Sequence, residues 1–170
     1  QHSLEIALAE TTRFWQDVFV DKLNIACDEE EAGRLRRTYL TSFPEAYKED
    51  FSASDGVAEV LVLDQLRAEG DVALNLYEPA DAALGERRFK IYRRGTQISL
   101  STVLPVLQSL GVDVLDERPY DMSLDDGTAL WLYDFGIRML GGPAFDLASL
   151  KTRFEDAFRA VWSNDAEIDN

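Results

Sequence analysis

Apolar side chains recur every three or four residues along the first third of the chain, which is the spacing of one helix face. In the first segment that face comprises Leu4, Leu8, Trp15, Phe19, Leu23 and Ala26. The acidic run 28–31 then opens a second helix, because negative charge favours the positive end of a helix dipole, and Pro44 ends it. Capping residues at 52–55 introduce a third helix that stops at Gly70.

The apolar period then changes from helical to alternating. Residues 72–77 and 87–93 alternate between two faces, which indicates two strands. Helical spacing returns at 101–110, where Ser101 is the expected N-cap and Gly111 the expected residue beyond the C-terminus. The middle of the chain therefore predicts the order strand, strand, helix.

The same order follows a second time. Alternation at 112–115 predicts a third strand and the apolar run 130–137 a fourth, and the turn-forming dipeptide Asp126-Gly127 lies between them. The breaker Gly141-Gly142-Pro143 precedes an amphipathic helix predicted at 146–163. Two strand–strand–helix units in tandem thus close the chain.

This order predicts an α+β fold. We expect one four-stranded, mainly antiparallel sheet with helices on one face, a permuted relative of the ferredoxin-like split βαβ arrangement, preceded by a helical segment. The expected divisions are a helical segment at 1–52, an α+β module at 53–164 and an acidic tail at 165–170. The absence of an initiator methionine at Gln1 is expected of a cut from a longer protein or of a processed form.

The composition of the chain limits the classes of partner that we expect. The chain carries a formal net charge of -15, which a nucleic-acid duplex or an anionic membrane would repel, so we expect neither as a partner. No apolar run approaches the roughly 20 residues that a membrane span needs, and the N-terminus has no signal-peptide pattern. The single cysteine, Cys27, excludes an internal disulfide and fits a reducing cytoplasm.

No pattern of catalytic, cofactor-binding or metal-ligating residues is recognisable. The only histidine, His2, lies near a terminus, and Cys27 has no partner at metal-ligand spacing. The acidic pair Asp116-Glu117 is expected at a strand end with its side chains on opposite faces, and Asp125-Asp126 is explained by a turn. Gly141-Gly142-Pro143 lacks the glycine spacing of a phosphate-binding loop.

One local contrast stands out in this acidic chain. Between residues 86 and 94 a single acid, Glu86, accompanies five basic side chains: Arg87, Arg88, Lys90, Arg93 and Arg94. The simpler interpretation is a solvated strand face paired with acidic neighbours across the sheet. The functional interpretation is a site for an anionic small molecule or an acidic partner surface.

Several motifs occur together and in order along residues 40–140. They are Pro44-Glu45-Ala46-Tyr47-Lys48-Glu49-Asp50-Phe51, Arg93-Arg94-Gly95, Leu100-Ser101-x-x-Leu104-Pro105-x-Leu107-x-x-Leu110-Gly111, Asp116-Glu117-Arg118-Pro119-Tyr120 and Asp134-Phe135-Gly136. In combination they resemble the N-terminal regulatory region of the large bacterial NAD-specific glutamate dehydrogenases. That region is taken to hold ACT-like modules, which elsewhere often bind amino acids or make subunit contacts.

The resemblance implies a non-catalytic regulatory or assembly module of a cytoplasmic enzyme of amino-acid metabolism. The parent would use NAD to oxidise L-glutamate to 2-oxoglutarate and ammonia, with catalysis further along the chain and no catalytic residue in this part. Its partners would be other domains and subunits of the parent. The alternatives are a free-standing amino-acid-sensing ACT-like domain and an enzyme of unrecognised type.

One loop is the predicted place for an amino-acid effector. It comprises Arg94, Gly95, Thr96, Gln97 and Ser99, between a strand and the following helix. A glycine lets a ligand approach the backbone, the helix N-terminus offers free N–H groups to a carboxylate, and the arginine adds a charged donor. The competing interpretation is a turn at Gly95 with a helix cap at Ser99 or Ser101.

Overall fold

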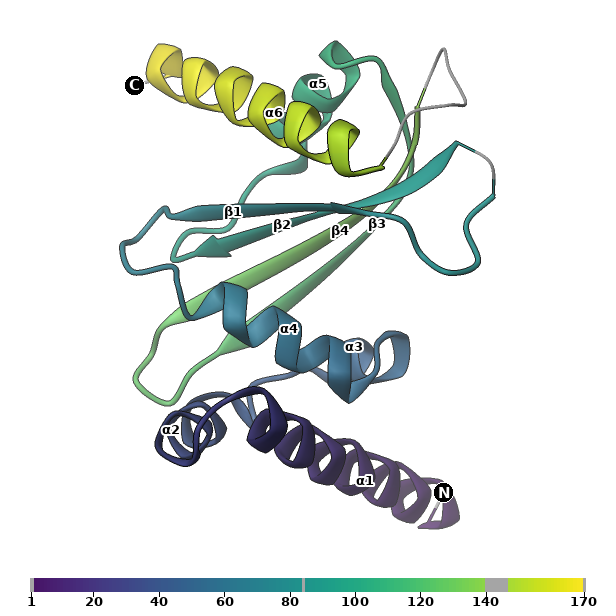
Figure 1. The fold of residues 1–170 in the computed structure, drawn as a ribbon, viewed down its shortest axis with the longest axis vertical. Helices are drawn as coiled ribbons and strands as arrows, with labels where there is room; N and C mark the ends of the chain where they lie inside the picture. The colour runs from purple at the N-terminus through teal and green to yellow at the C-terminus, as the bar shows by residue number, and fades with distance from the viewer. Residues whose placement is uncertain (1, 84, 140–146, 170) are drawn as a thin grey trace.

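The structure is a computed structural model that describes residues 2–83, 85–139 and 147–169. Its helices and strands follow the order predicted from the sequence, with one additional short helix before the first strand. The four helices that come first are α1 (His2–Ala26), α2 (Glu29–Tyr39), α3 (Glu45–Asp50) and α4 (Ala53–Leu63). Figure 1 shows these helices on one side of a sheet and two later helices on the other.

The four strands form one antiparallel sheet, which confirms the predicted fold class. They are β1 (Val72–Tyr77), β2 (Glu86–Arg94), β3 (Val112–Ser123) and β4 (Ala129–Met139), in the spatial order β1-β2-β4-β3. All three neighbouring pairs run antiparallel. Strands β1 and β3 are therefore the sheet edges, and β2 and β4, which supply most of the buried sheet residues, lie in the centre.

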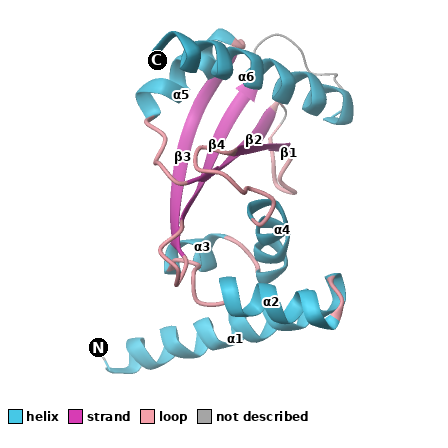
Figure 2. Cartoon of the chain, turned by 90° about the vertical axis from the view of Figure 1, so that its left-hand side faces the viewer, coloured by secondary structure: helices cyan, strands magenta, loops and turns pink. Residues whose placement is uncertain are grey.

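Helices α5 (Leu100–Ser109) and α6 (Leu147–Asp169) cover one face of the sheet, here called the α5 face (Figure 2). Their apolar side chains join alternate residues of the central strands in one hydrophobic cluster, which includes Phe89, Ile91, Phe135, Phe154 and Phe158. Successive strand residues point to opposite faces, so the remaining strand residues are directed to the other side.

The helical segment packs against that opposite face, here called the α4 face. A second hydrophobic cluster contains Phe19, Leu35 and Val60 of the helices together with Tyr92 and Leu132 of the sheet. Aromatic rings of α1 and α3 pack edge to face within it, as in the Trp15–Tyr47 pair with centroids 6.1 Å apart. The helical segment and the sheet thus share a core, so the sheet has helices on both sides.

The N-terminal helices differ from the prediction in their ends. The second helix stops at Tyr39, although Phe43 beyond it is still buried. Pro44 does not end that helix; it is the N-cap of the short helix α3, which the hydrophobic pattern did not reveal. Helix α4 begins at a capping box in which Ser52 and Asp55 exchange hydrogen bonds, as the capping residues predicted.

Three later elements also begin or end at other residues than the sequence predicted. Helix α5 starts at Leu100 with Ser99 as N-cap, so the assignment of Ser101 as the cap is wrong; the Ser99 and Ser101 hydroxyls bond each other instead. Strand β3 continues to Ser123, past a bulge between Val114 and Asp116 that interrupts the alternation. Helix α6 runs to Asp169, through the residues expected to form an acidic tail.

The predicted break at Gly141-Gly142-Pro143 lies outside the described residues. His2 belongs to α1, as expected of the first helical segment. Within the part of the chain that the structure describes, no helix combines the length and apolar character needed to cross a membrane.

Candidate functional site

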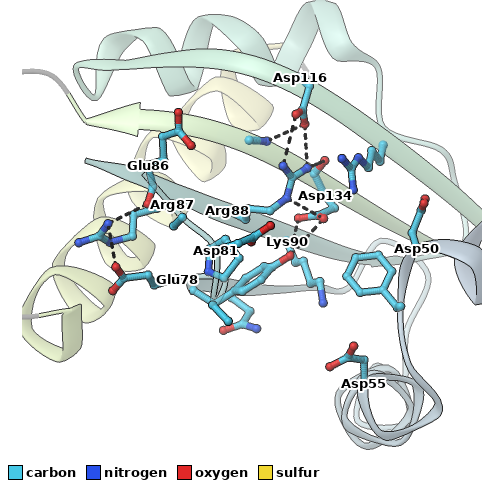
Figure 3. A pocket seen from close by; sticks show the side chains of 18 of the residues that line it. Asp50, Asp55, Glu78, Asp81, Glu86, Arg87, Arg88, Lys90, Asp116 and Asp134 are labelled. Atoms are coloured by element: carbon cyan, nitrogen blue, oxygen red, sulfur yellow. Dashed lines mark hydrogen bonds and ion pairs between the residues drawn. The ribbon is translucent and has the colours of Figure 1, made fainter. Parts of the chain in front are cut away.

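The helical segment covers only part of the α4 face, and the rest of that face is an open cleft of about 740 Å³ (Figure 3). Its floor is made by side chains of all four strands, among them Tyr77, Lys90, Asp116 and Asp134. One wall is formed by the end of α3 and the start of α4, and the other by the β1–β2 connection around Asp81. The size is that of a ligand pocket.

A buried ion pair joins the helical wall to the floor. Lys90 Nζ of β2 lies 2.8 Å from Glu59 Oε2 of α4, and both residues are almost completely buried. The hydroxyls of Tyr92 and Tyr47 also donate to Glu59, at 2.7 and 3.1 Å. The Lys90 ammonium lies 4.4 Å from the centre of the Phe51 ring. The Lys90 charge is thus held by an ion pair and aromatic ring faces at a site with little exposure to solvent.

A second charged network crosses the floor. Arg88 Nε donates to Asp134 Oδ2 at 2.9 Å and Arg88 Nη2 donates to Asp116 Oδ1 at 2.7 Å, which links the three strands β2, β4 and β3. The Tyr77 hydroxyl donates to Asp134 at 3.1 Å, and the Gly136 N–H donates to Asp116 at 3.2 Å. A Cβ at Gly136 would lie 2.9 Å from Arg88 Nη1, so glycine leaves the room that this network needs.

The two carboxyls that hold Arg88 respond to their surroundings in opposite ways. Burial raises the pKa of Asp134, although Arg88 and Lys90 act against the rise. The hydrogen bond from Arg88 lowers the pKa of the more exposed Asp116. Burial also raises the pKa of the Tyr47, Tyr77 and Tyr92 hydroxyls, and the nearby carboxylates reinforce it. These tyrosines therefore remain neutral hydrogen-bond donors.

The lining of the cleft carries more negative than positive charge. It holds four basic side chains, Arg87, Arg88, Lys90 and Arg118, and eight carboxylates, Asp50, Asp55, Glu59, Glu78, Asp81, Glu86, Asp116 and Asp134. The floor groups are matched in ion pairs, whereas the described structure shows no ion pair for the rim residues Asp50, Asp55 and Asp81. Of the basic strand, Arg88 pairs with acids across the sheet, whereas Lys90 pairs with Glu59 of α4. The surplus of carboxylates around the cleft favours a cationic rather than an anionic group.

This arrangement has the character of a binding or structural site. The buried charges are already compensated by fixed partners, and the tyrosines stay protonated, so none is prepared as a nucleophile or general base. Among the described residues, no cluster of histidine, cysteine or acidic side chains has the arrangement of a metal site. Cys27 is a free, half-buried thiol at the end of α1.

The loop predicted to hold an effector is divided between two hollows. Arg94, Gly95 and Thr96 line a shallow hollow of about 380 Å³, whereas Gln97 and Ser99 line another of about 590 Å³ at the start of α5. Arg94 Nη1 donates to the Leu66 carbonyl at 3.4 Å. The structure thus places the five residues along one loop without gathering their side chains around one cavity.

Gly95 meets a conformational requirement at this loop. Its φ is +94°, and a Cβ there would lie 2.5 Å from Glu69 Cγ. Its N–H donates to the Ala129 carbonyl and its own carbonyl accepts from Trp131 Nε1. The conformation and contacts of this turn are enough to explain why residue 95 is a glycine, without a ligand.

Sequence reasoning singled out Arg88 and Lys90 but missed the cleft around them. The signal was present in the motifs, because three of them meet there. Pro44–Phe51 supplies Asp50 and Phe51 to the wall, Asp116–Tyr120 supplies Asp116 and Arg118, and Asp134–Gly136 supplies both of its end residues. Along each strand motif the contributing residues alternate, so they share one face of the sheet.

A four-stranded antiparallel sheet with two helices on one face, built from two strand–strand–helix units, defines the chain as an ACT-like module joined to a helical segment. Comparison with known families agrees. Residues 71–150 match "Glutamate dehydrogenase, ACT3 domain" and residues 22–66 match "Glutamate dehydrogenase, helical motif 2". The chain belongs to the family of the NAD-specific glutamate dehydrogenases, of which these two elements are parts.

Individual relatives align over almost the whole chain. NAD-specific glutamate dehydrogenase from Halomonas elongata is 32% identical over 169 residues, and that from Pseudomonas aeruginosa 29% over 166, each covering 98% of this chain. The Mycobacterium tuberculosis protein of the same name is 30% identical over 167 residues and covers 95%. The chain spans 10% of the length of each of these relatives.

Proposed function

We propose that this chain is a non-catalytic regulatory or assembly module of a large NAD-dependent glutamate dehydrogenase, which oxidises L-glutamate to 2-oxoglutarate and ammonia. The observation that carries the proposal is the alignment of nearly the whole chain with a tenth of enzymes that bear this name. The compensated charges of the cleft support a binding role for this part of the enzyme.

In this proposal NAD binds to another part of the parent enzyme, and the partners of the module are other domains and subunits of that enzyme. The relatives are named for their NAD specificity, and the chain itself carries no dinucleotide-binding glycine pattern. We propose a cytoplasmic location for the parent, in keeping with the single unpaired cysteine.

An amino-acid effector is the second part of the proposal. We place it at the loop of Arg94, Gly95, Thr96, Gln97 and Ser99. The hollow beside Gln97 and Ser99 supports this choice, because it opens at the N-terminus of α5, where Ser99 makes no side-chain cap and the positive end of the helix dipole faces a ligand carboxylate.

The test of the catalytic half of the proposal uses the 170-residue chain itself. We expect no glutamate oxidation by the purified chain and no tight binding of NAD in a calorimetric titration. Turnover of glutamate above a boiled-protein control would overturn the assignment of a non-catalytic module. Heat from tight NAD binding would contradict the assignment of the cofactor to another domain.

A further inference from the structure

The cleft on the α4 face has the features of a surface that another polypeptide segment covers. We propose that a basic segment of the parent enzyme, lying outside these 170 residues and carrying arginine or lysine side chains, docks in this cleft. The inference rests on the proposed function, because it requires other domains of the same enzyme. It adds the place of contact and the chemistry of the partner.

Charge complementarity is the first argument. The floor is neutralised by its own ion pairs, but the rim carboxylates Asp50, Asp55 and Asp81 are in no ion pair within the described structure. The Tyr120 hydroxyl donates to Asp50 and the Ser52 N–H to Asp55, and these neutral donors leave the negative charges uncompensated. Figure 3 shows Asp50 and Asp55 beside the helical wall and Asp81 over the floor. Arg118, a basic residue of the lining, has no ion pair among the described residues either, and against these three carboxylates it leaves a negative surplus. Cationic side chains from outside would satisfy it.

A rigid floor is the second argument. Asp134 is 0% exposed and is held by Arg88 and Tyr77, and Lys90 is held by Glu59. A surface whose side chains are already fixed loses little conformational freedom when a partner covers it. The exposed ends of the rim carboxylates then remain to select the partner by charge.

The edge of strand β3 is a less suitable place for such a contact. Its bulge after Val114, the missing N–H of Pro119 and the exposed acids Asp113, Glu117 and Asp121 are features that discourage pairing with another strand. At the other edge, β1 already contacts α6, where Glu155 accepts from the Leu76 N–H. Compared with the two sheet edges, the cleft is therefore the more suitable docking place, because it is open and its acidic rim favours a cationic partner.

Hydrogen exchange compared between the isolated chain and the parent enzyme tests the proposal. We expect the amides of residues 78, 80–82 and 115–118, which border the cleft, to exchange at least about ten-fold more slowly in the parent, since ten-fold corresponds to about 1.4 kcal/mol. In a parent carrying Asp50→Asn and Asp81→Asn this protection should fall to that of the isolated chain. The matched variant with Asp113→Asn and Asp125→Asn, exposed acids outside the cleft lining, should keep it.

Three results would overturn the docking proposal. The first is equal exchange in parent and isolated chain. The second is loss of protection in the matched variant, which would mean general attraction to an acidic protein. The third is full protection of the isolated chain by spermidine or by raising its own concentration, which would assign the cleft to a small amine or to a second copy. A normal circular dichroism spectrum must accompany each variant. None of these results bears on whether the chain oxidises glutamate.

Discussion

Glu59 of α4 and Lys90 of β2 form an ion pair whose charged atoms lie 2.8 Å apart in the interior. Their exposures are 2% and 5%, so water contributes little to the stability of either charge. This pair joins the helical segment to the sheet across 31 positions of the sequence. It adds a charged contact to the hydrophobic core that the helices and the sheet share.

Removing one member of this pair should be costly, because it leaves a buried charge without its partner. We expect Lys90→Met to lower the free energy of unfolding by about 3–5 kcal/mol, measured by urea denaturation. Lys90→Met combined with Glu59→Gln should lose less, since no buried charge is left and the amide can still bond both hydroxyls, its oxygen accepting from one tyrosine and its NH2 donating to the other. Arg138→Met, which breaks the exposed pair with Glu86, should cost under about 1 kcal/mol. An equal, small cost for Lys90→Met and Arg138→Met would contradict the account.

A glycine in α4 allows α1 to pack closely. A Cβ at Gly56 would lie 2.7 Å from Trp15 Cη2, and Trp15 is in the core. We expect Gly56→Ala to destabilise the protein by about 1–3 kcal/mol through overpacking. The matched change is Gly33→Ala in α2, where the added Cβ would meet the flexible end of Arg37 at 3.2 Å. That change should stabilise by up to about 1 kcal/mol. Thermal melts of both variants give the comparison, and equal melting temperatures would refute it.

The stability of the floor network should depend on acidity in a defined direction. The hydrogen bond from Arg88 lowers the pKa of folded Asp116 below the unfolded value of about 3.9. Its contribution is therefore present above about pH 4 and is lost as the pH falls through the folded pKa. Asp134 has a raised pKa, so its contribution has the opposite sign and is lost as the pH rises.

We expect Asp116→Asn to flatten the decline in unfolding free energy on acidification from pH 5 to roughly pH 3, the range around the ordinary aspartate pKa. Asp113→Asn, on the same strand but outside the network, is the control and should keep the slope of the unsubstituted protein. Urea titrations at several pH values provide the measurement. The same slope for Asp116→Asn and the unsubstituted protein would show that the Arg88 contact does not lower the pKa of Asp116.

Effector binding at the Arg94–Ser99 loop is tested by a thermal-shift screen against the common amino acids. An effector at 100 times its Kd should add about 2.7 kcal/mol of stability. Arg94→Ala and Gln97→Ala should each weaken the response; Gly95→Val is less informative, since the positive φ strains any side chain there. Ala58, an exposed helix residue beside the other cleft, serves as the control when changed to Ser. If no amino acid shifts the midpoint, the loop is a structural turn.

The sequence predicted the order of the elements and the antiparallel sheet because both depend on local periodicity. It did not reveal α3, since six residues are too few to show a helical period. It also treated Lys90 as one member of a solvated basic strand, whereas the structure buries it against Glu59. The partner lies in another element, and a pairing between elements leaves no mark on the local pattern of either one.

The candidate cleft was hidden for the same reason. Asp116 was expected at a strand end, but the bulge after Val114 carries β3 onward and places Asp116 beside Arg88. The loop at Gly95 was singled out because a glycine before a helix is visible in one short stretch. The cleft needs contributions from α3, α4 and all four strands, and only the tertiary structure brings these together.

The most direct test of a regulatory or assembly role is excision of residues 1–170 from the parent enzyme, with a short flexible linker in their place. Three quantities are then measured on the purified protein: NAD binding, the number of subunits per assembly and the glutamate saturation curve. We expect NAD binding to persist while the number of subunits or the saturation curve changes. Loss of NAD binding in a protein that is still folded would make this chain part of the catalytic unit. An unchanged number of subunits and an unchanged curve would show that the module neither regulates nor assembles the enzyme.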